Sequence, residues 1–438
     1  MSYVPSTPSQ RAEMLSALGC SSARELFGGL PAEVLLGELN LPEGLSELEV
    51  SRRMEQLAGK NRVYSTIFRG AGAYDHYIPA IVKSVTSKEE FLTAYTPYQA
   101  EISQGILQSI FEFQTMICEL TGMDSSNASV YDGATAAAEA VAMTKERKRV
   151  RAFVSATTPP QVLAVMRTYC AGSDTELTVV PERDGRTDAA ALASLLGEDS
   201  ACFYLQQPNY YGILEDAAGL GEIVHAAGAK FIMGCNPIPL AILQSPAEAG
   251  ADIAVGEGQP LGLPLSFGGP YLGFMACRQA LTRKLPGRIV GETTDGEGNR
   301  AFVLTLQARE QHIRREKASS NICSNEALCA MTAAVYLAAM GPEGLQNCAR
   351  QCRAKAHYLA ARLSELPGFT LCHEAAFFHE FVMTCPIPAS RLLAALEREG
   401  ILGGLPLDEG RILWCATEKN TRADIDRLVE LIREEASR

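Results

Sequence analysis

Seven short apolar runs, roughly 20–25 residues apart, place the strongest constraint on how this chain can fold. They lie at residues 128–131, 151–154, 177–180, 201–205, 230–233, 252–255 and 271–275. Most intervals between them have a helical pattern, and strands that alternate with helices form a mostly parallel sheet covered on both faces. Strands buried on both faces are continuously apolar, as these runs are. We therefore predict an α/β fold with a mostly parallel seven-stranded sheet.

Helical patterns surround this central region. Short helices are predicted at 10–18, 22–27 and 46–57, and apolar residues spaced by three and four predict a long amphipathic helix over 101–122. From residue 325 two helical patterns follow, broken at Gly341 and Pro342, and a strand-helix-strand-helix pattern comes after them. We predict a helical arm at 1–60, a large α/β domain at 61–329 and a small α+β domain at 330–438.

Charge and cysteine content exclude several classes of protein. The 39 basic and 51 acidic residues give a net charge of −12, whereas a nucleic-acid binder needs a basic face. No apolar run approaches the roughly 18 residues of a membrane span. The 13 cysteines include no C-x-x-C pair, so we expect free thiols and a cytoplasmic protein without partners among nucleic acids or membranes.

One pair of histidines and one pair of cysteines are candidate metal ligands. His373 and His379 are six residues apart and would not share one helix face. Cys348 and Cys352 are one helical turn apart, but no histidine or further cysteine stands at ligand spacing from them. We predict two semi-buried thiols there and no metal site in the chain.

One segment has the pattern of a phosphate site. Residues 131–135 (YDGAT) end an apolar run and open an alanine-rich helix that continues to Met143. The free N–H groups of a helix start can hold a phosphate, although simple capping by Asp132 or Thr135 is the more expected alternative. With the sheet and the small C-terminal domain, this segment suggests the architecture of many pyridoxal-phosphate enzymes.

Such an enzyme needs a lysine for the Schiff base and usually a carboxylate facing the pyridine nitrogen. The sequence contains no lysine between Lys230 and Lys284, where the Schiff base would form. Cys235 and Asn236 stand where the carboxylate is expected. The chain therefore lacks the groups that bind the cofactor covalently and tune its ring.

Six long segments resemble those of a known family. They are residues 70–77 (GAGAYDHY), 95–105 (YTPYQAEISQG), 111–122 (FEFQTMICELTG), 256–262 (GEGQPLG), 266–271 (SFGGPY) and 309–323 (REQHIRREKASSNIC). In order and position they are similar to the N-terminal (alpha) part of the glycine cleavage system P-protein, the glycine decarboxylase. The resemblance extends from about residue 3 to 345 and is weaker beyond.

This resemblance implies a fold and different roles for two subunits. The fold would be the pyridoxal-phosphate-dependent transferase type I fold, with a smaller C-terminal α+β domain. The P-protein is either one chain of two homologous halves or two subunits, and a length of 438 residues matches the split type. The beta subunit would then carry pyridoxal phosphate and its lysine. The complex, an oxidoreductase, would decarboxylate glycine and pass the aminomethyl group to the lipoyl group of the H-protein, with this chain active only beside its partner.

The resemblance also implies site residues at the subunit interface. We expect Tyr95 and Tyr98 to act in catalysis and Thr96 and Gln99 to point towards the partner's cofactor, because such hydroxyls and amides can donate to phosphate or carboxylate oxygens. The alternative is aromatic packing between the subunits.

Two further candidates come from other loops. Ser319 and Asn321 follow a stretch, 278–317, with nine basic and five acidic residues, which could attract an acidic H-protein or a carboxylate. The alternative is a solvated, salt-bridged helix. His76, next to Asp75, could move protons, or it could be a structural histidine.

Two other readings of the whole chain remain open at this point. The chain could be an autonomous pyridoxal-phosphate enzyme that uses Lys230 or Lys284. It could also be a non-catalytic scaffold of the same fold.

Overall fold

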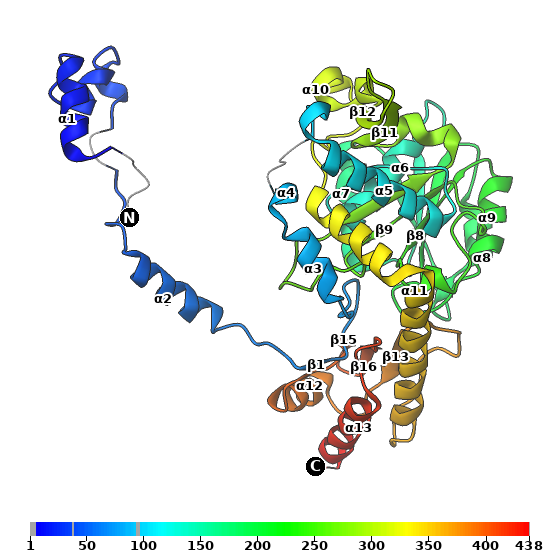
Figure 1. The fold of residues 1–438 in the computed structure, drawn as a ribbon. Helices are drawn as coiled ribbons and strands as arrows, with labels where there is room; N and C mark the ends of the chain where they lie inside the picture. The colour runs from blue at the N-terminus through cyan, green and yellow to red at the C-terminus, as the bar shows by residue number, and fades with distance from the viewer. Residues whose placement is uncertain (1–5, 37–38, 93–96, 438) are drawn as a thin grey trace. The chain divides into compact units, whose positions relative to one another are not determined.

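The computed structural model describes residues 6–36, 39–92 and 97–437, and the chain divides into two compact units, Met1–Val63 and Tyr64–Arg438 (Figure 1). The first unit contains the helices α1 (Pro8–Ala17) and α2 (Glu47–Ala58) and the 3₁₀ turns Ala23–Phe27 and Ala32–Val34. Thr7 and Ser46 begin the two helices with capping boxes. The predicted short helices are thus present, and none of the residues described in this unit is buried.

The second unit is built on a seven-stranded sheet in the order β2-β10-β9-β8-β7-β3-β4. The bounds are β2 Ser125–Ser126, β3 Arg151–Ser155, β4 Glu176–Val180, β7 Ser200–Gln207, β8 Lys230–Cys235, β9 Ile253–Glu257 and β10 Gly273–Cys277. Strand β10 runs antiparallel to β9 and β2, and the remaining pairs are parallel. The predicted mostly parallel seven-stranded sheet is confirmed.

Six of the predicted strands lie where the apolar runs indicated, and the first does not. The run 128–131 was expected to be a strand, but the edge strand is the short β2 that precedes it. Within that run only Val130 forms a bridge, to Gly273. The reason is the backbone of Ser129, whose φ of 104° cannot continue a strand and turns the chain towards the next helix.

Helices cover both faces of the sheet and create two apolar cores (Figure 1). One core lies against α6 (Gly133–Thr144) and α7 (Pro160–Gly172). The other lies against α5 (Gln104–Thr121), α8 (Ala189–Leu195), α9 (Ala217–Ala226) and the first half of α11 (Ala327–Ser364). Successive residues of β7 point into opposite cores, Phe203 into one and Tyr204 into the other, so the strand is apolar throughout.

The long helix α11 joins the sheet to the C-terminal part of the unit. Gly341 has φ 60° and ψ 178° and breaks the helix before Pro342, at the predicted position. Beyond the break a third core forms around β13 (Glu380–Thr384), α12 (Ala389–Arg398), β14 (Ile401–Leu402), β16 (Arg411–Cys415) and α13 (Arg422–Ala436). Strand β15 (Leu405–Asp408) pairs with β16. Strand β1 (Thr66–Ile67) pairs with β14, so the chain passes through this part before it reaches the large sheet.

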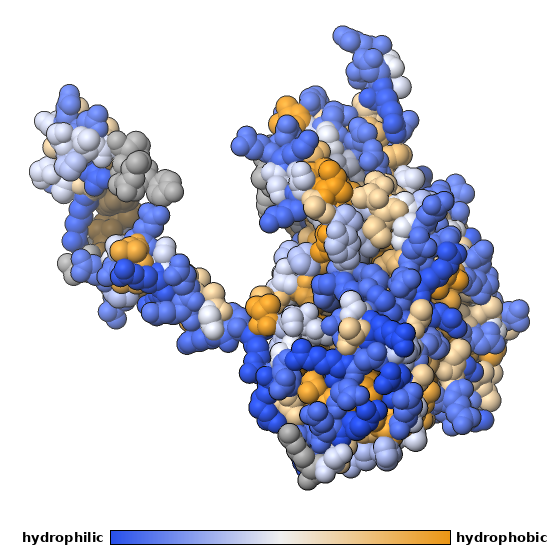
Figure 2. All heavy atoms as spheres, turned by 60° about the horizontal axis from the view of Figure 1, so that its bottom comes forward, coloured by the Kyte–Doolittle hydropathy of each residue, from blue (hydrophilic) through white to orange (hydrophobic). Residues whose placement is uncertain are grey.

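The remaining elements lie in connections. They are α3 (Ala80–Thr86), α4 (Glu89–Leu92), the ribbons β5 (Glu182–Arg183) with β6 (Arg186–Thr187) and β11 (Ile289–Thr294) with β12 (Arg300–Thr305), α10 (Gln311–Arg314), and the 3₁₀ turns Ala100–Ile102, Pro239–Ala241, Gln279–Lys284, Gln307–Arg309 and Arg315–Lys317. Figure 2 shows a face on which apolar side chains are scattered among polar ones.

Helix α11 is long and apolar enough to cross a membrane when length and composition alone are considered. Side chains in both halves of it, however, are buried in the protein interior: Ala333 and Tyr336 belong to one core, and Leu359 and Leu363 belong to another. A helix whose apolar residues pack inside the protein has no continuous apolar surface to offer to lipid. We therefore interpret α11 as a core helix.

Candidate functional site

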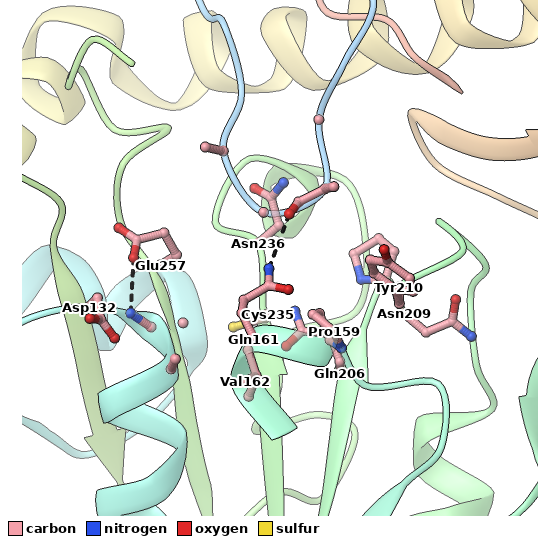
Figure 3. Close-up of a pocket in the computed structure, with 18 of the residues that line it drawn as sticks. Asp132, Pro159, Gln161, Val162, Gln206, Asn209, Tyr210, Cys235, Asn236 and Glu257 are labelled. Carbon is pink, nitrogen blue, oxygen red and sulfur yellow. Dashed lines mark hydrogen bonds between the residues drawn. The ribbon is translucent and has the colours of Figure 1, made fainter. Parts of the chain in front are cut away.

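A cavity of about 420 Å³ lies where β7, β8 and β9 end, next to the beginning of α6 (Figure 3). Ligands of parallel α/β sheets bind at these carboxyl ends. Residues 70–74 form one wall, and Gln161 ties that wall to α7 through a hydrogen bond to the carbonyl of Ala71 (3.1 Å). Glu380 of β13 closes the cavity from the C-terminal part.

Two carboxylates occupy the start of α6. Asp132 caps the helix by accepting a hydrogen bond from the amide of Thr135 (2.7 Å). Of the two interpretations of residues 131–135, capping is therefore the one present in the structure. Oε2 of Glu257, at the end of β9, accepts from the amide of Gly133 (2.9 Å), as Figure 3 shows. Its Oε1 accepts from the amides of Gln259 (3.0 Å) and Leu272 (2.9 Å). Glu257 therefore supplies the anion that a phosphate would supply at this helix.

Burial raises the pKa of Glu257, and the backbone hydrogen bonds to the carboxylate partly offset that effect. The residue is nevertheless tied to three amides that belong to α6 and to the ends of the two adjacent strands. We infer that it holds these segments together.

The floor of the cavity is filled by uncharged side chains. The hydroxyl of Tyr204 donates to Gln206 (2.7 Å) and lies over Gly234, where an added Cβ would meet it at 2.0 Å. Cys235 and Asn236 follow at the end of β8 and line the cavity, as the sequence placed them. Burial raises the pKa of Cys235 to about 12, so this thiol stays neutral.

Glu380 is a buried carboxyl on the opposite wall. It accepts hydrogen bonds from the amide of Ala71 (2.6 Å) and the hydroxyl of Tyr74 (2.8 Å). Burial raises its pKa to about 7, and these two hydrogen bonds act in the opposite direction. The group links the loop at 70–74 to the C-terminal part of the unit.

The described lining of this cavity offers pyridoxal phosphate neither a lysine nor a free helix start. None of the described residues that line it is a lysine. Lys230 lies at the opposite end of β8, paired with Asp252 (3.0 Å), and Lys284 is paired with Glu146 (3.2 Å). The helix start that would receive the phosphate already holds a carboxylate. The two lysines that an autonomous pyridoxal-phosphate enzyme would use thus form ion pairs outside this cavity.

The predicted loop at 95–99 is described only in part. Tyr95 and Thr96 lie outside the described residues. Tyr98 is 58% exposed and Gln99 is also exposed, at the start of the 3₁₀ turn Ala100–Ile102. Arg288 donates to the hydroxyl of Tyr98 (2.9 Å) and stacks over its ring, with the guanidinium carbon 5.1 Å from the ring centre.

Arg288 was not identified from the sequence, where it is one of many basic residues. It is buried, and besides Tyr98 it donates to the carbonyl of Cys323 (2.8 Å). It also donates to Ser324 (3.2 Å) and Asn325 (3.0 Å). One side chain thereby joins the Tyr98 loop to the segment that follows Ser319 and Asn321.

Ser319 and Asn321 line a different cavity, of about 280 Å³, beside Glu139 and Tyr169. Burial raises the pKa of Glu139 to about 7, while hydrogen bonds from Ser320 and Tyr169 oppose the shift. The structure does not bring these two residues into the cavity at the sheet.

His76 is buried, with Nδ1 2.7 Å from Oε2 of Glu418. Its proposed part in proton transfer stays a prediction. Asp75 beside it pairs with Lys419 (2.6 Å).

The fold defines a class of protein: the type I fold of pyridoxal-phosphate enzymes. Solved structures of this class resemble the chain in fold alone, such as the sphingosine-1-phosphate lyase of Burkholderia pseudomallei K96243 (15% identity, TM-score 0.66, covering 93% of this chain and 94% of that one). Another crystal structure is far more similar: glycine decarboxylase (P-protein) of the glycine cleavage system, in inhibitor-bound form (43% identity, TM-score 0.93, covering 99% of this chain and 100% of that one).

Sequence comparisons agree with this structural similarity. The profile of the family described as "Glycine cleavage system P-protein" matches residues 1–432. The chain is 52% identical to a probable glycine dehydrogenase (decarboxylating) subunit 1 of Moorella thermoacetica, covering 99% of each chain. It is 48% identical to the protein of the same description from Desulfitobacterium hafniense, covering 98% of each. The chain belongs to the glycine cleavage system P-protein family.

Proposed function

We propose that this chain is the subunit of a two-subunit glycine decarboxylase that does not hold the cofactor. The observation that carries the proposal is the carboxylate of Glu257 at the start of α6, in a cavity whose described lining contains no lysine. The relatives named subunit 1 imply a partner subunit. The partner would hold pyridoxal phosphate, which takes up electrons when glycine loses CO2.

The contribution of this chain would then lie on its surface. Tyr98 and Gln99 are exposed, and so are residues 311–317. Arg288 ties Tyr98 to Cys323, which follows the second of these segments along the chain. We propose that Tyr98 and Gln99, with Tyr95 and Thr96 of the same loop and with Ser319 and Asn321, complete the glycine or cofactor site of the partner. A buried arginine that fixes two loops gives the rigid support that such a site needs.

The same surface suggests how the lipoylated H-protein would be attracted. Arg314, Arg315 and Lys317 are exposed within the locally basic stretch, on a chain whose net charge is −12. Exposed charges of one sign accelerate association with an acidic partner, and salt screens the effect. We place this reaction in the cytoplasm, because the 13 cysteines are free thiols in the structure.

Co-expression with the beta subunit of a split P-protein tests the proposal. The purified complex should exchange CO2 with the glycine carboxyl in the presence of lipoylated H-protein, and this chain alone should not. After borohydride reduction, mass spectrometry should locate the pyridoxyl group on the beta chain. A reduced adduct on this chain would contradict the proposal and favour the autonomous enzyme.

Variants separate a catalytic subunit from a scaffold. Tyr98→Phe should lower turnover while the complex still assembles, because only the hydroxyl is lost. Tyr358→Phe is the matched control, since its hydroxyl bonds Asp426 (2.7 Å) in the C-terminal part of the unit. Full activity of Tyr98→Phe, Ser319→Ala and Asn321→Ala together would favour the scaffold.

A further inference from the structure

Four side chains that commonly bind metals converge away from the cavity at the sheet. They are His76, Cys348, Cys352 and Glu418, and one ligand atom of each lies within 4.8 Å of the others. The sequence predicted no metal here, because no histidine or further cysteine stands near the two thiols along the chain. The fold brings His76 to them across 272 residues.

Three separate elements place these ligands. Cys348 and Cys352 are four residues apart on the second half of α11, so their side chains share one face. His76 lies in the loop that begins at the cavity wall and leads to α3. Glu418 follows β16, and its Oε1 accepts from the amide of Tyr77 (2.5 Å), which leaves Oε2 directed at the cluster.

The distances approach those of a tetrahedral site. Sγ of Cys348 is 3.9 Å from Nδ1 of His76, Sγ of Cys352 is 3.2 Å from Oε2 of Glu418, and that oxygen is 2.7 Å from Nδ1. Zinc bonds of about 2.3 Å to sulfur and about 2.0–2.1 Å to nitrogen and oxygen imply ligand separations of about 3.3–3.8 Å. The three distances differ from that range by about 0.1 to 0.6 Å, which small side-chain rotations accommodate.

Burial and donor chemistry narrow the choice of ion. His76, Cys348 and Cys352 are buried, while the Glu418 side chain is 15% exposed and marks an entry path. Two thiolates, an imidazole and a carboxylate suit Zn²⁺ and not Mg²⁺ or Ca²⁺, which prefer oxygen ligands. The buried hydroxyl of Tyr336 lies next to Cys348, where a zinc-bound thiolate would accept a hydrogen bond from it.

We propose that His76, Cys348, Cys352 and Glu418 form a structural zinc site. On binding, the two thiols and the protonated imidazole release their protons to solvent, and the two sulfurs, the imidazole nitrogen and a carboxylate oxygen each donate an electron pair to the metal. The ion would tie the loop that forms the cavity wall at 70–74 to α11 and to the segment after β16. The same segment is already linked to that loop by Lys419 and Asp75.

Metal analysis of the full-length chain, in complex with the beta subunit and free of tags, tests this assignment. After loading with zinc and desalting, the wild-type complex should retain one zinc per copy of this chain. Replacement of zinc by Co²⁺ should give thiolate-to-cobalt charge-transfer absorption and the strong visible bands of tetrahedral cobalt. Both readouts use the unmodified protein and do not depend on a variant that folds.

Variants locate the ion. Cys348→Ser with Cys352→Ser should lose the stoichiometric zinc, and Glu418→Gln should bind it at least about tenfold more weakly. Cys329→Ser is the matched control, a buried cysteine of the same helix outside the cluster. The proposal is overturned if the wild type retains no stoichiometric zinc, if the double variant retains it, or if Cys348 and Cys352 prove to be joined by a disulfide.

Discussion

Replacing Glu257 with alanine should turn a structural contact into an anion site. The carboxylate accepts from the amides of Gly133, Gln259 and Leu272, and its removal leaves these three donors without a partner. A buried donor without a partner costs about 1–3 kcal/mol. Because the adjoining cavity of about 420 Å³ admits water to some of them, we expect the lower end of the sum, about 3 kcal/mol.

Inorganic phosphate should then restore part of the lost stability. A ligand that binds only the folded state at 100 times its dissociation constant stabilises it by about 2.7 kcal/mol. We therefore expect phosphate to raise the thermal midpoint of Glu257→Ala and to leave the wild type nearly unchanged. Differential scanning fluorimetry over a phosphate series, at ionic strength held constant with chloride, measures both.

Two controls separate this effect from unspecific stabilisation. Glu257→Gln keeps an oxygen for two of the amides and also keeps the volume filled, so it should lose stability without a response to phosphate. Asp216→Ala removes the exposed cap of α9, whose carboxylate accepts from Gly219 (3.1 Å), and it should not respond either. Equal stabilisation of the wild type and Glu257→Ala by phosphate would refute the reasoning.

Three further predictions concern other parts of the second unit. As the pH rises from 4.5 to 7, the free energy of unfolding of Glu380→Gln should increase relative to that of the wild type, by up to about 3 kcal/mol. In that range Glu380, whose pKa is about 7 in the folded protein, keeps its proton, whereas the unfolded chain has lost it. Wild-type stability therefore falls as pH rises. Urea unfolding of both proteins at pH 5 and pH 8 measures the difference. Arg288→Lys should lower turnover of the complex about tenfold to 100-fold without loss of assembly, because one ammonium cannot hold both loops; unchanged turnover would contradict this. Gly341→Ala should cost about 1–3 kcal/mol in thermal unfolding through φ alone, since no atom lies within 4 Å of the added Cβ.

The sheet could be predicted from the sequence because burial on both faces makes each central strand a continuous apolar run. The failure at residues 128–131 shows the limit of that signal. Val130 is buried and apolar, as a strand residue would be, but its neighbour Ser129 has a positive φ. An apolar run reports burial and not backbone direction, so a buried turn and a buried strand look alike.

The cavity and the metal cluster were only partly visible in the sequence. The absence of a lysine between Lys230 and Lys284 could be read directly from the sequence. That Glu257 reaches α6 depends on how β9 lies next to the start of that helix, which is a property of the sheet order. The cysteine pair was visible as a helical spacing, whereas Glu418 is 66 residues from Cys352 along the chain and His76 is 272 residues from Cys348.

Electrostatic magnitudes support the proposal that the cofactor is held by the partner and not at this helix start. Two unit charges 4 Å apart repel each other by about 4 kcal/mol at an effective dielectric constant of 20, so a phosphate dianion next to Glu257 would meet about twice that. A helix start contributes typically about 0.3–1 kcal/mol to binding an anion, and at most about 2 kcal/mol. Protonation of Glu257 would relieve the repulsion, but a neutral carboxyl accepts the three amide bonds more weakly. With Glu257 ionised the repulsion exceeds the attraction, which supports our proposal that this chain acts through its exposed loops and a partner that holds the cofactor.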